Sequence, residues 1–108
     1  MCSSDLIPLK PSEYFRRNIR IGSSCMSRRE AEMRHEIGIG TIMWGTDYPH
    51  PGGVWPITHK MMVETFHGLP EHEIAQMLGG NAAEFYGFDT DKLAPIVERI
   101  GPEKSLFR

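Results

Sequence analysis

This chain of 108 residues has few cysteines, no long apolar run and no large excess of one charge. Two cysteines, Cys2 and Cys25, are too few for a disulfide scaffold and lack metal-binding spacing, so we expect a reduced, cytoplasmic protein. No apolar stretch approaches the roughly 18–20 residues of a membrane span, and the N-terminus lacks the pattern of a secretory signal. The formal net charge of -2 argues against a nucleic-acid partner.

Strand-like and helix-like segments alternate in the first half of the chain. Residues 1–13 contain two prolines and predict an incoming loop, and the alternating pattern of residues 18–24 predicts a short strand. Ser27, with Glu30 three positions later, predicts a helix start; Met33 and Ile37 would form the inner face of that helix, which stops at Gly38. The apolar run over residues 41–45 predicts a strand buried on both faces.

The second half is predicted to be helical. We expect one helix over residues 57–67 and a second from Pro70 to the Gly79-Gly80 pair. A short helical turn that ends near Gly87 follows, and the apolar repeat of residues 93–100 predicts a last helix. The glycine pair is predicted to end its helix in a left-handed turn, and Asn81 to cap the helix that follows. A strand, a helix and a second strand in succession indicate parallel pairing, and two such strands are too few for a stable sheet. The pattern therefore predicts an α/β fold of which this chain forms a part.

The loop after the second strand carries the residues best suited to chemistry. Asp47 follows the strand and His50 lies three residues later, where α/β folds build their active sites. The carboxylate could ligate a metal or accept a proton, and the imidazole could bind substrate or hold the acid through a hydrogen bond. Taken alone, an aspartate here is also a common turn former, and a histidine in a proline-rich loop is often only exposed.

Four segments of the chain together resemble one family. They are Glu13–Ile19, Trp44–Pro51, Trp55-Pro56 and Leu78–Gly87. Their order and spacing are similar to the last part of amidohydrolase-related proteins, in the branch that includes aminocarboxymuconate-semialdehyde decarboxylase. The resemblance extends from about Lys10 to Pro102, which is nearly the whole chain.

This resemblance implies the C-terminal fragment of a (β/α)8 TIM barrel, consisting of about its last two strands with their helices. Residues 1–90 would belong to the barrel and residues 91–108 would form a C-terminal helix and tail. The family's centre is a divalent metal, commonly zinc, at the carboxyl ends of the strands. Asp47 matches the eighth-strand aspartate that ligates the metal or deprotonates its water, and His50 matches a histidine that faces the substrate.

The activity that the resemblance implies is hydrolysis of a C–N or ester-like bond in a small-molecule substrate by metal-activated water. Non-oxidative decarboxylation within the same family, and a truncated inactive remnant, remain as alternatives. The chain has no His-x-His pair, and a complete barrel needs about 250 residues. With one ligand where three or more are usual, we expect the chain alone to be inactive. It would need the N-terminal portion of the barrel, or assemble as a homo-oligomer.

Overall fold

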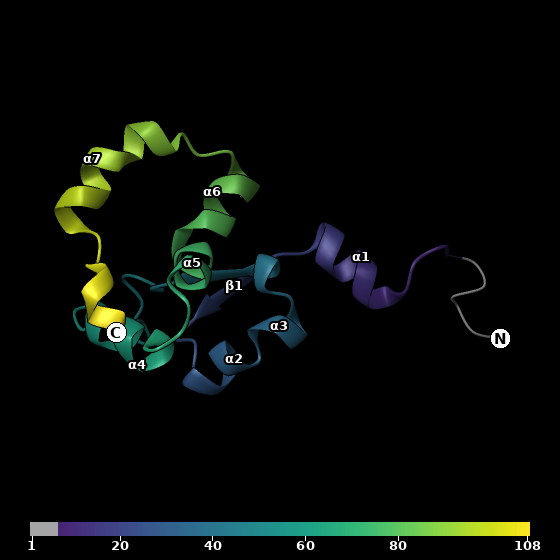
Figure 1. The fold of residues 1–108 in the computed structure, drawn as a ribbon, viewed down its shortest axis with the longest axis horizontal. Coiled ribbons are helices and arrows are strands. Elements are labelled where there is room, and N and C mark those ends of the chain that lie inside the picture. Colours follow the sequence, from purple (N-terminus) through teal and green to yellow (C-terminus); the bar gives the residue numbers. More distant parts are fainter. Residues whose placement is uncertain (1–6) are drawn as a thin grey trace.

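Two short parallel strands lie at the centre of the computed structural model, which describes residues 7–108 (Figure 1). Strand β1 (Ile21–Ser24) pairs with β2 (Ile42–Gly45) along their whole length, from Ile21 opposite Ile42 to Ser24 opposite Gly45. Helices form the connection between the two strands, as the alternation in the sequence predicts. The chain is therefore a mixed α/β structure with a small parallel sheet.

Helical segments make up most of the remaining described chain. In order they are α1 (Pro11–Asn18), α2 (Arg28–Glu32), α3 (Arg34–Ile37), η2 (Ile39–Thr41), α4 (Thr58–Phe66), α5 (Glu71–Ala75), η3 (Gln76–Gly80), α6 (Asn81–Tyr86), α7 (Thr90–Ile100) and η4 (Lys104–Phe107). No helix in the described part of the chain is long and apolar enough to cross a lipid bilayer.

The N-terminal part of the prediction is wrong in one respect. Helix α1 begins at Pro11, inside the expected loop, and the first strand begins at Ile21 rather than at residue 18. Proline fits the first helical position because its missing N–H has no helical partner there. The Lys10 N–H donates to the Glu13 carboxylate at 2.7 Å, which fixes the first turn. Residues 1–6 of the expected loop lie outside the described residues.

The predicted helix start at Ser27 is confirmed. The Glu30 N–H donates to Ser27 Oγ at 3.2 Å, and the Ser27 N–H donates to the Glu30 carboxylate at 2.6 Å. The hydrogen bond from the Ser27 backbone N–H to the Glu30 carboxylate, and after it the interaction with the Ser27 side chain, lowers the pKa of Glu30. The helix does not continue evenly to Gly38, because a turn at Met33 separates α2 from α3. That turn leaves Met33 exposed, so this part of the predicted inner face is wrong, whereas Ile37 packs partly buried against the core as expected. Ala31 is the fully buried residue of α2.

The hydrophobic core lies between the sheet and the helices that follow it. Its buried members are Met26, Ala31, Ile42, Phe66, Ile74, Met77 and Phe107. Of strand β2 only Ile42 is buried, and Met43 and Trp44 keep part of their surface. The expectation of a strand buried on both faces is therefore wrong for this chain. Two strands offer too little sheet for helices to cover both faces.

The expected break at the glycine pair is also wrong. Helix α5, the π-helical turn η3 and helix α6 follow one another without interruption from Glu71 to Tyr86. Gly80 (φ -58°) and Asn81 (φ -63°) both have right-handed helical backbones, so there is no left-handed stop and no cap. The Asn81 amide instead donates to the carbonyl oxygens of Ile39 at 2.7 Å and Ile42 at 2.8 Å. These two bonds tie the long helical segment to the start of β2.

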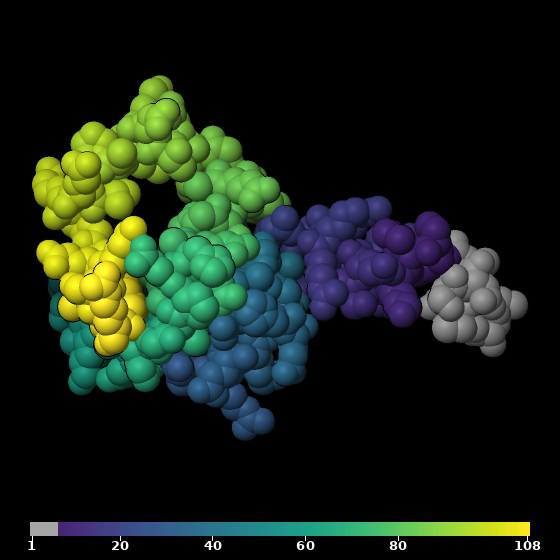
Figure 2. Space-filling model, viewed as in Figure 1, coloured from purple at the N-terminus to yellow at the C-terminus, as the bar shows by residue number. Residues whose placement is uncertain are grey.

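Helix α7 forms as predicted, yet its apolar face has little cover. Asp89 caps its first turn by accepting from the N–H groups of Asp91 and Lys92, and Gly87 before it is left-handed (φ 71°). The apolar side chains of α7 are 40–62% exposed: Leu93, Ile96, Val97 and Ile100. Figure 2 shows this segment, in yellow-green, as an arch that stands away from the body of the molecule.

Candidate functional site

The carboxyl ends of β1 and β2 lie side by side, because the strands are parallel and in register. Just beyond each end the chain turns through a left-handed residue, Cys25 (φ 54°) after β1 and Asp47 (φ 56°) after β2. Asparagine and aspartate adopt this conformation more readily than most residues with a side chain. The Cys25 thiol donates to the Gly52 carbonyl at 3.0 Å. The two loops that follow the strands therefore touch at one edge of the sheet.

The loop after β2 closes on itself through its own backbone. The His50 N–H donates to the Asp47 carbonyl at 2.8 Å, the Gly53 N–H to the His50 carbonyl at 2.9 Å, and the Val54 N–H to the Thr46 carbonyl at 3.0 Å. A Cβ atom at position 53 would lie 2.7 Å from the Thr46 carbonyl oxygen and 2.9 Å from that of Asp47. Glycine is therefore required there, and the turn holds Asp47 and His50 at a fixed separation.

Asp47 and His50, the two predicted site residues, form a pair. His50 Nδ1 lies 3.2 Å from Asp47 Oδ2, which is the contact expected from their spacing. Both side chains are open to solvent, with 45% of Asp47 and 70% of His50 exposed. The pair is therefore accessible to a small molecule from outside, although water screens its charges.

The ring nitrogen in this pair has two alternative partners. His50 Nδ1 lies near the Asp47 carboxylate on one side, and the Gly52 backbone nitrogen lies 3.4 Å from the same ring nitrogen. In a neutral imidazole each ring nitrogen either donates a hydrogen bond or accepts one. The contact with the Asp47 carboxylate requires Nδ1 to be the donor. In that tautomer Nε2 carries the lone pair and can accept a proton from a bound molecule. The geometry thus supports an Asp–His unit able to take up a proton.

Two aromatic side chains flank this loop. The Tyr48 and Trp55 rings meet edge to face, with centroids 5.7 Å apart, and both rings are exposed. Together with Thr46 and Thr58 they line an open cavity of about 400 Å³. Sequence reasoning did not identify this pair, nor the roles of Gly53 and Cys25. The Gly52-Gly53 pair and the two aromatic residues beside prolines are the sequence signals from which a tightly folded loop could have been predicted.

The donor set of this site meets only part of what a divalent metal needs. A carboxylate is a suitable ligand, so Asp47 fits one position of such a centre. Among residues 7–108, however, no group of three or more His, Cys, Asp or Glu side chains could hold a metal ion together. A protein zinc site commonly takes three or four protein ligands. The described residues therefore bring fewer than three such side chains together and do not form a metal centre themselves.

Comparison with known proteins identifies the family. A search of curated proteins and a search of solved structures each gave no match. A model of the family described as Amidohydrolase matches residues 9–88, about three quarters of the chain. The matched range includes both strands and the whole loop with Asp47 and His50, and it ends before α7. We conclude that this chain belongs to the amidohydrolase family.

Proposed function

We propose that this chain is the C-terminal part of a metal-dependent hydrolase that cleaves a C–N or ester-like bond in a small-molecule substrate. The observation that supports this most directly is the Asp47–His50 pair at the carboxyl end of β2, within the range that matches the family. Strand ends of this kind are where α/β folds assemble their catalytic groups.

In this proposal Asp47 has two tasks. Its carboxylate provides one metal ligand and accepts a proton from the attacking water, while the contact with His50 fixes its orientation. A bound divalent ion, which we propose to be zinc, would supply an activated water at neutral pH. His50 faces the substrate through Nε2, which is free to accept a hydrogen bond when Nδ1 donates to Asp47.

The remainder of the centre has to come from outside the described residues. We propose that β1 and β2 are the last two strands of a (β/α)8 barrel in the aminocarboxymuconate-semialdehyde decarboxylase-like branch. The parallel pairing supports this, as do the outer edges of the sheet, which pair with no further strand within residues 7–108. The other strands would come from an N-terminal portion of the barrel or from further copies of the chain.

The first experiment is the intact mass of the native protein in its source cells, followed by its metal content. A mass of about 30 kDa or more, as a whole barrel requires, with stoichiometric metal supports the proposal. Stoichiometric metal in a 12.3 kDa protein that assembles into oligomers supports a shared site. A metal-free protein that binds the dye ANS indicates an inactive remnant and contradicts the proposal.

The Asp47→Asn variant then tests the proposed site in whichever native form holds the metal. Asparagine keeps the shape and tolerates the left-handed backbone but neither ionises nor accepts a proton, so we expect a loss of activity of about 100-fold or more. Asp91→Asn, at an exposed position outside the family match, is the matched control and should retain activity. Ester and amide hydrolysis are measured beside release of CO2. Normal turnover by Asp47→Asn would refute the assignment, and CO2 release without hydrolysis would establish the decarboxylase instead.

A further inference from the structure

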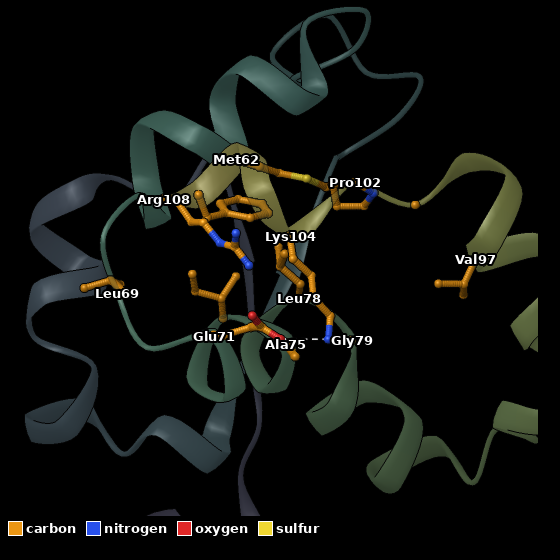
Figure 3. A pocket seen from close by; sticks show the side chains of 13 residues that line it. Met62, Leu69, Glu71, Ala75, Leu78, Gly79, Val97, Pro102, Lys104 and Arg108 are labelled. Carbon is orange, nitrogen blue, oxygen red and sulfur yellow. Dashed lines mark ion pairs between the residues drawn. The ribbon is translucent and has the colours of Figure 1, made fainter.

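A cavity at the amino ends of the two strands differs in its charge from the hollow beneath α7. That hollow is mainly apolar, and its Lys104 is paired with Glu71 at 2.7 Å (Figure 3). The cavity at the strand ends has a volume of about 360 Å³, within the range of roughly 300–1,000 Å³ that is typical of small-molecule sites. Its lining consists of Arg16, Arg20, His35 and residues 38–41. Basic side chains therefore line this cavity, and no carboxylate does.

This cavity lies at the opposite edge of the sheet from the proposed catalytic loop. Arg20 directly precedes β1 and residues 38–41 directly precede β2, whereas Asp47 follows the carboxyl end of β2. Helix α1 leads into β1 at this edge (Figure 1). Its Arg16 packs beside Gly38, where a Cβ atom would lie 3.4 Å from both Cγ and Nε of the arginine. The cavity thus forms where the end of α1 meets the segment before β2.

The chain itself holds the guanidinium of Arg20 in place. Nη1 donates to the carbonyl oxygens of Arg16 at 3.1 Å and Ile19 at 3.0 Å. The group also lies over the Phe85 ring of α6, 5.5 Å from the ring centroid. Within residues 7–108, Nε and Nη2 make no hydrogen bond. These two nitrogens form the edge of the planar group that can bind two oxygens of an anion side by side.

No neighbouring acid compensates the charge of this cavity. In the described part of the chain, neither Arg16 nor Arg20 forms an ion pair. Glu73 lies 2.9 Å from His35, but this carboxylate is already paired with Arg34 at 2.7 Å. Two positive charges therefore remain at the cavity. A pair of guanidinium groups attracts a doubly charged anion more strongly than a singly charged one.

We propose that this cavity binds the phosphoryl group of a small molecule. Phosphate carries close to two negative charges at neutral pH and offers several acceptor oxygens. Two of these oxygens accept from Nε and Nη2 of Arg20, and another pairs with Arg16. The space along residues 38–41 has room for the organic part of a phosphate monoester. Residues 10–20 carry four basic side chains and one acidic one, which adds attraction at longer range.

Titration of the 108-residue chain with inorganic phosphate at constant ionic strength tests the proposal, by calorimetry and by NMR shifts of the Gly38 and Gly40 amides. We expect saturable binding of one phosphate per chain. Acetate, with a single charge, should bind about tenfold more weakly. Glycerol phosphate distinguishes two sources of the phosphoryl group: tighter binding indicates a phosphate monoester, and equal binding indicates inorganic phosphate. No saturation with either compound, or equal affinity for acetate, would overturn the proposal.

Matched variants of α1 and its flank separate a defined site from a diffuse basic surface. Arg16→Gln removes one charge, and Arg20→Lys keeps the charge but removes the paired donors, so each should weaken phosphate binding about tenfold. Arg17→Gln removes the same charge from the same helix outside the lining, and at about 0.15 M salt it should weaken binding less than about twofold.

Arg16→Gln keeps the test valid even if Arg20→Lys loosens α1. The Arg16 side chain makes no hydrogen bond within residues 7–108, so its replacement leaves the fold intact, which circular dichroism checks. Equal losses in Arg16→Gln and Arg17→Gln would show a diffuse basic surface. Binding of a single-stranded oligonucleotide that all three variants weaken alike, with no saturable phosphate site, would assign this surface to nucleic acid. Either result overturns the proposal.

Discussion

Two amphipathic helical segments of this chain have similar sequence patterns and very different surroundings. In the segment from Glu71 to Tyr86, Ile74 and Met77 are buried against the sheet and α4. In α7 the apolar residues have the same helical spacing but remain 40–62% exposed. The repeat therefore determines which face of a helix is apolar, whereas the presence of a packing partner determines whether that face is buried.

Specific polar contacts distinguish the packed segment from α7. Asn81 binds two backbone carbonyls at the start of β2, and Glu73 forms an ion pair with Arg34 at 2.7 Å. Helix α7 is joined to the body through the short links at its two ends, near Gly87 and Gly101 (Figure 1). Mutations can test whether this difference in contacts is also a difference in stability.

Truncation of an apolar side chain should have its largest effect in the packed region. Phe66→Ala removes a fully buried ring at the centre of the core, so we expect a loss of about 3–5 kcal/mol in the free energy of unfolding. Ile100→Ala on the exposed face of α7 should change it by less than about 0.5 kcal/mol. Urea unfolding followed by circular dichroism measures both. Similar losses in the two variants would remove the distinction between the segments.

Loss of the Asn81 amide should have the next largest effect. In Asn81→Ala the carbonyl oxygens of Ile39 and Ile42 lose their shared donor in a buried position, which costs about 1–3 kcal/mol. The exposed Asn18→Ala at the end of α1 serves as the control and should lie within about 0.5 kcal/mol of the wild type. The same urea titration applies. A neutral Asn81→Ala would mean that apolar packing alone holds the segment on β2.

The side chains of the Asp47 loop are exposed, yet its backbone is closely packed around Gly53. Gly53→Ala places a Cβ against two carbonyl oxygens at less than 3.0 Å, so the loop has to open, at a cost of about 1–2 kcal/mol. Gly52→Ala is the matched control, because its Cβ would meet only His50 at 3.5 Å. Chemical shifts of His50, together with urea unfolding, report the change. If both variants behaved alike, close packing would be confined to the buried core.

The smallest expected effect concerns pH. A hydrogen bond and charge from Arg34, with the nearby His35 and His72, lower the pKa of Glu73 below its ordinary value of 4.5. A carboxylate with a lowered pKa adds stability above that value, and this stability is lost as the pH falls through the lowered pKa. Thermal melts between pH 6 and pH 3 should show a steeper fall for the wild type than for Arg34→Gln. Arg29→Gln should follow the wild-type curve, and parallel curves for Arg34→Gln would contradict this contribution.

Local signals in the sequence were sufficient for most of the fold. The parallel strands, the helix start at Ser27, the helix over α4 and the end of α6 at Gly87 follow from capping, periodicity and turn residues. The Asp47–His50 contact follows from their spacing in the loop. Their proposed roles in catalysis and metal binding stay predictions, because these roles depend on groups outside the described residues.

Partners distant in the sequence explain what local reasoning missed. The glycine pair and Asn81 have the composition of a helix stop and a cap. The Asn81 amide instead donates to carbonyls some 40 residues earlier in the chain, and the helix continues through this position. Similarly, the exposure of α7 depends on what lies opposite it, which no periodicity can reveal. The close approach around Gly53 is a property of the folded turn rather than of a two-residue motif.

The left-handed backbone at Asp47 limits how this position can change over evolutionary time. Aspartate, asparagine and glycine are the residues that accept such a φ at low cost, so substitutions to most others are opposed by the backbone itself. A single-base change can convert aspartate to asparagine or glycine. The substitutions that the backbone tolerates best at this position therefore keep the shape of the loop but remove the carboxylate. Under the role proposed for Asp47, one such step would turn a catalytic family member into a well-folded inactive one.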